Sequence, residues 1–295
     1  MLFWYGAKTG AVKFRALLIG PLLALSWLPP APAASGQARP ASPSPSGPTQ
    51  RFRFDAGAPL VAPAGVAEDG GLCVGTVDGY VHALNADGSY RWSRSVHGAV
   101  TRRPLFAGQL WYIATSADRV YALTRDGALY WVFKPPSPIN SELGADAAFA
   151  LYFVAADRFL YGVSAHGGVT LRTPFGDLKA GPSSGPDGAI WAKNQAGIVV
   201  RARGQDVRRF GPDGPSELVF ADPEVLRDPQ GHEWRAGSNG VLEFRAAADA
   251  APSFVALTSS ALLAPTWSVA ARYAVLSARS GVLFALDPAG VRRER

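Results

Sequence analysis

The chain has 295 residues, of which 48% are hydrophobic and 18% are charged, and its formal net charge is +6. This length and hydrophobic content are sufficient to bury a large core, so they exclude disorder of the whole chain. The single cysteine, Cys73, excludes an intramolecular disulfide. It lies in the apolar run Leu72-Cys73-Val74, and we interpret it as a small buried hydrophobic residue rather than a reactive thiol.

The N-terminus has the features of an export signal. Basic residues at Lys8, Lys13 and Arg15 precede an apolar run over residues 16–28, and the small residues of 31–33 follow. A membrane anchor is the competing interpretation, but it needs about 20 apolar residues, and this run is shorter and interrupted by glycine and proline. We therefore predict that residues 1–33 are a cleaved signal peptide. The mature protein is expected to be exported, periplasmic or secreted, without a stable membrane span.

Residues 34–50 are dominated by Pro, Ser, Ala and Gly. Such a composition buries too little apolar surface to offset the entropy lost on ordering. We predict a disordered linker here, with the folded part occupying residues 51–295.

The charge of the mature chain is close to balanced. The signal peptide contains three basic residues and no acidic one, so 26 basic and 23 acidic residues remain. Basic residues occur in short pairs such as Arg102-Arg103 rather than in runs. This pattern does not provide the electrostatic surface of a nucleic-acid-binding protein.

Beyond the linker the sequence repeats itself. Residues 79–92 (GYVHALNADGSYRW) and 118–131 (DRVYALTRDGALYW) share Ala, Leu, Asp, Gly and Trp at positions that are each 39 apart. A third copy at 158–171 keeps an aromatic residue and the turn glycine but has Leu171 in place of tryptophan. Fainter copies follow, so that the equivalent positions are 79, 118, 158, 197, 240 and 281. The repeat defines six units of about 40 residues.

Each unit is predicted to consist of short strands. Runs such as residues 110–114 are rich in β-branched and aromatic residues, and turn residues separate them. Four strands in about 40 residues are typical of a propeller blade, whereas a stack of separate sandwiches would not explain a nearly fixed period. We predict an all-β fold, a β-propeller of about six four-stranded blades, with seven or eight left open. Either Arg51–Phe54 or Val291–Arg295 is expected to supply the outer strand of the last blade.

The turn and tryptophan pattern has a structural explanation. Gly88 and Gly127 are expected to provide the positive φ that a tight hairpin requires, and Asp87 and Asp126 favour the same turn. The tryptophans at 92 and 131 are expected to pack between blades, because their regular recurrence fits packing better than a ligand-stacking platform.

These repeats resemble those of the pyrroloquinoline-quinone-like (PQQ-like) propeller family. The resemblance rests on a small residue, an acidic residue, a turn glycine and a tryptophan, and it is sharp in the first three units only. Within the family, the chain resembles the outer-membrane barrel-assembly propeller more than the quinoprotein dehydrogenases. Many of those dehydrogenases stack the quinone on a ring made by adjacent cysteines, which a chain with one cysteine cannot form. The resemblance implies a propeller fold and a protein-binding role. The residues that carry it best are Ala83, Asn85, Asp87, Gly88, Trp92, Ala122, Asp126, Gly127 and Trp131.

No residues are predicted to be catalytic, cofactor-binding or metal-binding. The acidic turn residues are spread at the repeat spacing rather than clustered as calcium ligands would be. The histidines lack the spacing of a metal site, and no Gly-x-Ser-x-Gly motif indicates a nucleophile. The acidic turn residues are Asp78, Asp87, Asp118, Asp126, Asp157 and Asp187. The histidines are His82, His97, His166 and His232.

The expected function is that of an exported, non-enzymatic scaffold, monomeric and without a cofactor, which binds a protein or peptide partner in the cell envelope. The alternative is a propeller enzyme, a hydrolase or lyase acting on a carbohydrate or cell-wall fragment with its site at the channel mouth. Functional residues are expected where the repeat is broken, at 135–143 and 211–234.

Overall fold

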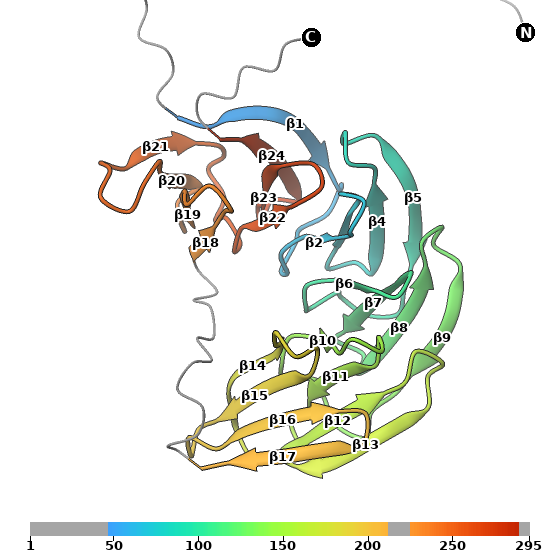
Figure 1. Cartoon of the computed structure of the whole chain (residues 1–295). Coiled ribbons are helices and arrows are strands. Elements are labelled where there is room, and N and C mark those ends of the chain that lie inside the picture. The colour runs from blue at the N-terminus through green and yellow to red at the C-terminus, as the bar shows by residue number, and fades with distance from the viewer. Residues whose placement is uncertain (1–46, 212–224, 289–295) are drawn as a thin grey trace, which may run out of the picture. The chain divides into compact units, whose positions relative to one another are not determined.

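The computed structural model describes residues 47–211 and 225–288. In this part of the chain every regular element is a β-strand, and the strands form six antiparallel sheets of four (Figure 1). Each sheet is one blade, so the prediction of an all-β propeller of four-stranded blades is confirmed, with six blades. Among the described residues there is no helix with the length and hydropathy needed to cross a bilayer.

Five of the blades take their four strands consecutively from the chain. Blade 1 contains β2 (Gly65–Val66), β3 (Leu72–Gly75), β4 (Tyr80–Leu84) and β5 (Tyr90–Ser95). Blade 2 contains β6 (Leu105–Ala107), β7 (Leu110–Thr115), β8 (Arg119–Thr124) and β9 (Leu129–Phe133), and blade 3 contains β10 (Gly144–Ala145), β11 (Leu151–Val154), β12 (Phe159–Val163) and β13 (Val169–Pro174). Blade 4 contains β14 (Leu178–Ser184), β15 (Ile190–Asn194), β16 (Val199–Arg203) and β17 (Asp206–Phe210), and blade 5 contains β18 (Val225–Arg227), β19 (Glu233–Ala236), β20 (Val241–Arg245) and β21 (Ser253–Ala256).

Blade 6 joins the two ends of the described chain. It contains β22 (Thr266–Ser268), β23 (Tyr273–Ser277) and β24 (Val282–Asp287), and its fourth strand is β1 (Thr49–Asp55). Strand β1 pairs antiparallel with β24 (Figure 1). Of the two candidates for this outer strand, the N-terminal one therefore supplies it, and residues 291–295 lie outside the described part. The signal peptide and residues 34–46 of the linker also lie outside it, and β1 begins at Thr49, two residues before the predicted start of the propeller.

Apolar side chains hold consecutive blades together. Five buried clusters join blades 1 and 2, 2 and 3, 3 and 4, 5 and 6, and 6 and 1. Strands such as β7 and β23 are buried along their whole length because they contribute side chains to a cluster on each face. This double burial explains why their sequences are continuous apolar runs rather than alternating ones.

The six equivalent positions found in the sequence all have the same backbone conformation. Each lies in the turn between the second and third strands of its blade, and each has a positive φ. The values are 85° at Gly79, 56° at Asp118, 66° at Arg158, 83° at Gly197, 79° at Gly240 and 98° at Gly281. The register of the six units predicted from sequence is therefore confirmed.

The repeated tryptophans pack between blades, as predicted, and they do so on the repeated glycines. A Cβ added to Gly127 would lie 2.7 Å from Cδ2 of Trp92, which belongs to the preceding blade. Likewise, a Cβ on Gly167 would lie 3.0 Å from Cγ of Trp131. The indole Nε1 of Trp92 donates to the carbonyl of Arg125 at 2.7 Å. Each ring thus occupies the space that the missing side chain leaves at the hairpin turn of the next blade.

We expect Trp131→Ala to destabilise the protein by about 2–4 kcal/mol, because it removes a half-buried ring and its hydrogen bond to the carbonyl of Ala165. Urea unfolding followed by circular dichroism measures this change. Tyr90→Ala is the control, since Tyr90 is 59% exposed, and should change the free energy of unfolding by less than about 0.5 kcal/mol. Equal effects of the two substitutions would contradict the interblade role.

Tyrosine hydroxyls form a second set of contacts between blades. Tyr112 donates to the carbonyl of Phe149 at 3.2 Å, and Tyr273 donates to the carbonyl of Ala86 at 2.9 Å. Burial raises the pKa of Tyr112 and that of Tyr273 to about 12. The neutral hydroxyls are therefore favoured by the folded state.

This shift predicts an alkaline limit of stability. In the unfolded chain tyrosine titrates near pH 10, so the contribution of these hydroxyls is complete below about pH 10 and is lost as the pH rises to about 12. We expect the free energy of unfolding of the wild type to fall across this range, and that of Tyr273→Phe to fall less steeply. Urea titrations at several alkaline pH values test this, and identical slopes for both proteins would exclude a contribution from Tyr273.

Candidate functional site

A cleft lies beside the loop that precedes blade 3. Its volume is about 490 Å³. Its lining includes part of the loop 135–143, where the sequence predicted functional residues, and much of β14. The lining residues are Arg102, Asn140, Ser141, Glu142, Leu178, Lys179, Ala180, Gly181, Pro182 and Ser183.

The loop is held in place by hydrogen bonds to its neighbours. The amide of Asn140 donates to the carbonyl of Val154 at 3.1 Å, and the hydroxyl of Ser141 accepts from the amide of Val154 at 2.8 Å. From the loop before blade 2, Arg102 donates through Nη2 to the carbonyl of Ile139 at 3.1 Å. These bonds give the cleft a fixed wall on the side of blade 3.

The opposite wall is an irregular strand. Pairing of β14 with β15 shifts register between Leu178 and Ala180 and again between Ala180 and Ser183. Such irregularities redirect side chains and often occur beside binding sites. Here they coincide with the residues that line the cleft.

The cleft carries hydrogen-bond donors and charges of both signs. Lys179 is exposed, whereas the Glu142 carboxylate accepts the amide of Arg103 at 3.1 Å. The Nε atom of Arg102 is buried and has no hydrogen-bond partner in the part of the chain that the structure describes. The arrangement can bind the carbonyl and carboxylate groups of a polypeptide.

The second repeat-breaking stretch, 211–234, is described only in part, because residues 212–224 lie outside the described ranges. Its remainder forms a buried polar cluster. The carboxylate of Asp228 contacts Nδ1 of His232 at 2.7 Å and accepts the indole N–H of Trp234 at 3.1 Å. It also accepts the amide of His232 at 3.0 Å, which closes the turn between β18 and β19.

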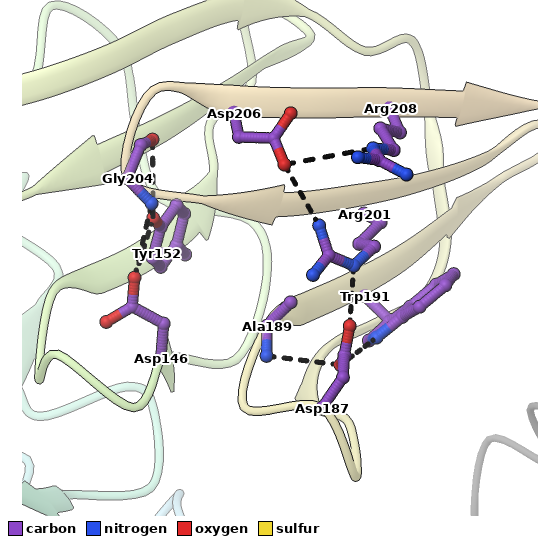
Figure 2. A network of polar contacts seen from close by, with 9 residues as sticks. All are labelled: Asp146, Tyr152, Asp187, Ala189, Trp191, Arg201, Gly204, Asp206 and Arg208. Atoms are coloured by element: carbon purple, nitrogen blue, oxygen red, sulfur yellow. Dashed lines mark hydrogen bonds and ion pairs between the residues drawn. The ribbon is translucent and has the colours of Figure 1, made fainter.

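The same kind of carboxylate closes the equivalent turn in two other blades. Asp146 accepts the hydroxyl of Tyr152 at 3.0 Å, and Asp187 accepts the indole N–H of Trp191 at 3.0 Å (Figure 2). In both turns the carboxylate also accepts backbone amides. We interpret these aspartates as turn locks, because their donors come from the turn and the strand that follows it. The sequence indicated Asp187 as a turn residue but missed Asp146 and Asp228, which lie six residues before an aromatic residue of the next strand.

The histidines have different neighbours. His82 lies near the rings of Phe54 and Tyr80, with centroid distances of 5.8 and 6.3 Å, and burial lowers its pKa. The amide of His97 donates to the hydroxyl of Tyr121, and Nδ1 of His166 contacts the hydroxyl of Tyr130. Across residues 47–211 and 225–288 no group of three or more His, Cys, Asp or Glu side chains could hold a metal ion.

Cys73 is fully buried in the cluster that joins blades 1 and 2, and burial raises the pKa of its thiol well above the usual range. The interpretation of this residue as a small buried hydrophobic residue agrees with that position.

Comparison with known proteins identifies the repeats. Residues 39–181 match the family model described as "Outer membrane protein assembly factor BamB". Over these residues the repeats are of the PQQ-like, BamB-like propeller type. Curated proteins give no significant match to the sequence.

Solved structures with the same fold include propellers of two kinds. BamB from Moraxella catarrhalis is 14% identical and superposes with a TM-score of 0.51, over 84% of this chain and 92% of its own. The WD40 domain of Pan2 from Neurospora crassa is 12% identical and superposes with a TM-score of 0.61, over 84% of this chain and 97% of its own. At this level of identity the two structures show the propeller fold alone.

The Asp187 turn lock predicts a pH-dependent loss of stability. The hydrogen bond from Trp191 and, after it, the bonds from Arg201 and Ala189 lower the pKa of Asp187 to about 2 against the opposing effect of burial. Because the carboxyl titrates near pH 3.9 in the unfolded chain, the contribution of Asp187 is complete above about pH 4 and is lost as the pH falls to about 2. We expect Asp187→Asn to lower the free energy of unfolding at pH 7 by about 1 kcal/mol, given the partial exposure of the carboxylate.

Chemical denaturation from pH 7 down to pH 2 checks this expectation. The difference between wild type and Asp187→Asn should shrink at the acid end. Asp126→Asn, which changes an exposed turn aspartate, is the matched control and should show no such trend. A difference that persists unchanged to pH 2 would show that the charge of Asp187 is not what stabilises the turn.

Proposed function

We propose that this chain is an exported, non-catalytic and monomeric scaffold that binds a protein or peptide partner in the cell envelope, as an accessory to outer-membrane protein assembly. One observation carries the proposal. The loop that breaks the repeat at 135–143 is anchored by hydrogen bonds and lines a cleft with donors for a polypeptide. The repeats around this cleft match the model of an outer-membrane assembly factor.

Peptide recognition fits the composition of the cleft. Its lining exposes more apolar than polar surface, as protein interfaces do. Lys179 and Arg102 supply positive charge, and Glu142 supplies a negative charge that selects against a uniformly acidic ligand. A partner segment with both kinds of side chain is favoured.

The hydrogen bonds of the turn carboxylates also support a binding role. The carboxylates of Asp146, Asp187 and Asp228 are occupied by turn amides and by aromatic donors. No specific observation in the described residues favours the alternative hydrolase or lyase. Export is supported by the N-terminal sequence of residues 1–33, and fractionation of cells that express the tagged full chain tests it.

Affinity capture from an envelope extract tests the scaffold role and its site together. We expect a reproducible protein partner for the wild type, with binding weakened about tenfold, or roughly 1.4 kcal/mol, by Lys179→Glu. Asn140→Trp should have a similar effect, because the larger side chain would fill the cleft. Both positions are exposed, so neither substitution is expected to unfold the protein.

Arg53→Glu is the matched control, since it reverses an exposed charge on β1, and it should leave capture unchanged. Equal capture by all variants would place the partner elsewhere on the propeller. Failure to capture any partner, together with turnover of a small substrate, would overturn the scaffold role.

A further inference from the structure

Blade 4 has one apolar face and one charged face. Ile190, Ala192 and Val200 belong to the cluster shared with blade 3. Their neighbours along each strand point the other way, and the cross-strand register aligns Trp191 with Arg201 and Arg201 with Arg208. The charged face of blade 4 comprises Trp191, Lys193, Arg201, Arg203, Asp206 and Arg208.

Side chains on this face interact with one another rather than with another blade. Arg201 contacts Asp187 and Asp206, and Asp206 also contacts Arg208 at 3.8 Å (Figure 2). The rings of Trp191 and Phe210 stack with centroids 5.6 Å apart. Two cations, Lys193 and Arg203, have no ion pair or side-chain hydrogen bond within the described residues.

Blade 5 has the same division. Trp234, Leu242 and Phe244 pack in the cluster shared with blade 6. On the opposite face, Arg227 pairs with Glu233 at 2.8 Å and Arg245 pairs with Glu243 at 2.9 Å. The charged face of blade 5 comprises Arg227, Glu233, Arg235, Glu243, Arg245 and Phe254.

This second face is accessible and hollowed. A depression of about 370 Å³ is lined by Val225, Glu233, Arg235, Glu243 and Arg245. Phe254 is 67% exposed, and Arg235 forms no ion pair or side-chain hydrogen bond inside the described ranges. Apolar and charged contacts are thus both offered to a ligand.

Unlike the other blade faces, these two do not pack against a neighbouring blade through an apolar cluster of described residues. Each of the five apolar clusters uses one face of each of two blades, and in the described part of the chain none joins blade 4 to blade 5. If the two charged faces packed together without water, their ion pairs would lose hydration. The attraction within the ion pairs does not reliably offset this desolvation free energy. The charged faces therefore remain hydrated unless a complementary group covers them.

The charge on the two faces is not balanced. They carry seven basic and three acidic side chains, with Asp187 of the neighbouring turn as a fourth acid. Lys193, Arg203 and Arg235 remain without a described acidic partner. The excess of cations favours an anionic occupant.

We propose that the charged faces of blades 4 and 5 are docking surfaces, each for an acidic, extended segment of a protein partner. The occupant is a polypeptide because Asp206, Glu233 and Glu243 would repel the continuous charge of a nucleic-acid backbone. An extended polypeptide can instead place acidic side chains against Arg203 on blade 4 or Arg235 on blade 5, and on blade 5 an apolar one against Phe254. The inference rests on the proposed scaffold role in that its occupant is a protein, but it concerns surfaces separate from the cleft.

Fluorescence anisotropy with a labelled peptide of alternating glutamate and tyrosine tests the proposal on the full chain. We expect the wild type to bind this peptide, to bind it less tightly as salt is added, and to bind the glutamine analogue at least about tenfold more weakly. The double substitution Arg203→Glu and Arg235→Glu should weaken binding of the glutamate peptide about tenfold or more. The same variant should bind the lysine analogue better than the wild type does, which shows that the variant is folded.

The matched control reverses two other exposed arginines, Arg53→Glu and Arg94→Glu on β1 and β5, and should bind the glutamate peptide as the wild type does. Unchanged binding by the Arg203/Arg235 variant, or equal binding of the glutamine analogue, would overturn the proposal. So would tighter binding of a short single-stranded DNA that is lost in the same variant. Lys179→Glu, which tests the cleft, should leave peptide binding intact. The proposed role of the cleft and the proposed role of the charged faces can therefore be rejected independently.

Discussion

The contact between an aromatic ring and a glycine turn organises the first half of this propeller. At Gly127 the turn needs a positive φ, and the absence of a side chain leaves room for the ring of Trp92 from the preceding blade. One glycine therefore serves both the hairpin and the interface. The two residues that recur most clearly in the sequence are therefore the two halves of one interblade contact. In the third copy Leu171 replaces the tryptophan, and the turn glycine of the next blade, Gly204, has no atom within 4 Å of its missing Cβ.

Packing between the later blades, from blade 3 onwards, depends on different interactions. Between blades 3 and 4 the hydroxyl of Tyr152 accepts the amide of Gly204 at 2.6 Å, so a polar contact replaces the ring. Blades 5 and 6 share an apolar cluster, and β1 links blade 6 to the start of the chain. Closure by β1 makes the N-terminal strand part of the last sheet. The fold thus tolerates two blades with a single apolar face each, because one cluster holds blade 4 against blade 3 and another holds blade 5 against blade 6.

The number and register of blades could be predicted because the repeat marks a backbone requirement. Position 118 is an aspartate and 158 an arginine, yet both have the positive φ found at the four glycines of the same turn. The choice of closing strand could not be predicted, since both termini had suitable sequences and only pairing in space decides between them. The turn locks of Asp146 and Asp228 were missed because a single aspartate before a strand resembles any turn residue. The loop 135–143 was predicted to hold functional residues because it interrupts a regular pattern, whereas the other wall of its cleft, β14, carried no such signal.

The charged faces were visible in the sequence as alternation. Strands such as 199–203 (VVRAR) and 241–245 (VLEFR) alternate apolar and charged residues, whereas 110–115 (LWYIAT) is continuous. In a propeller blade a continuous run indicates burial on both faces, and alternation indicates burial on only one. The faint repeats of the later units are therefore not merely degenerate copies. A blade that gives up one apolar face loses burial worth on the order of a few kcal/mol, and the side chains gained there contribute little to stability as exposed ion pairs. Such an exchange is understandable where a surface, rather than a core, is required.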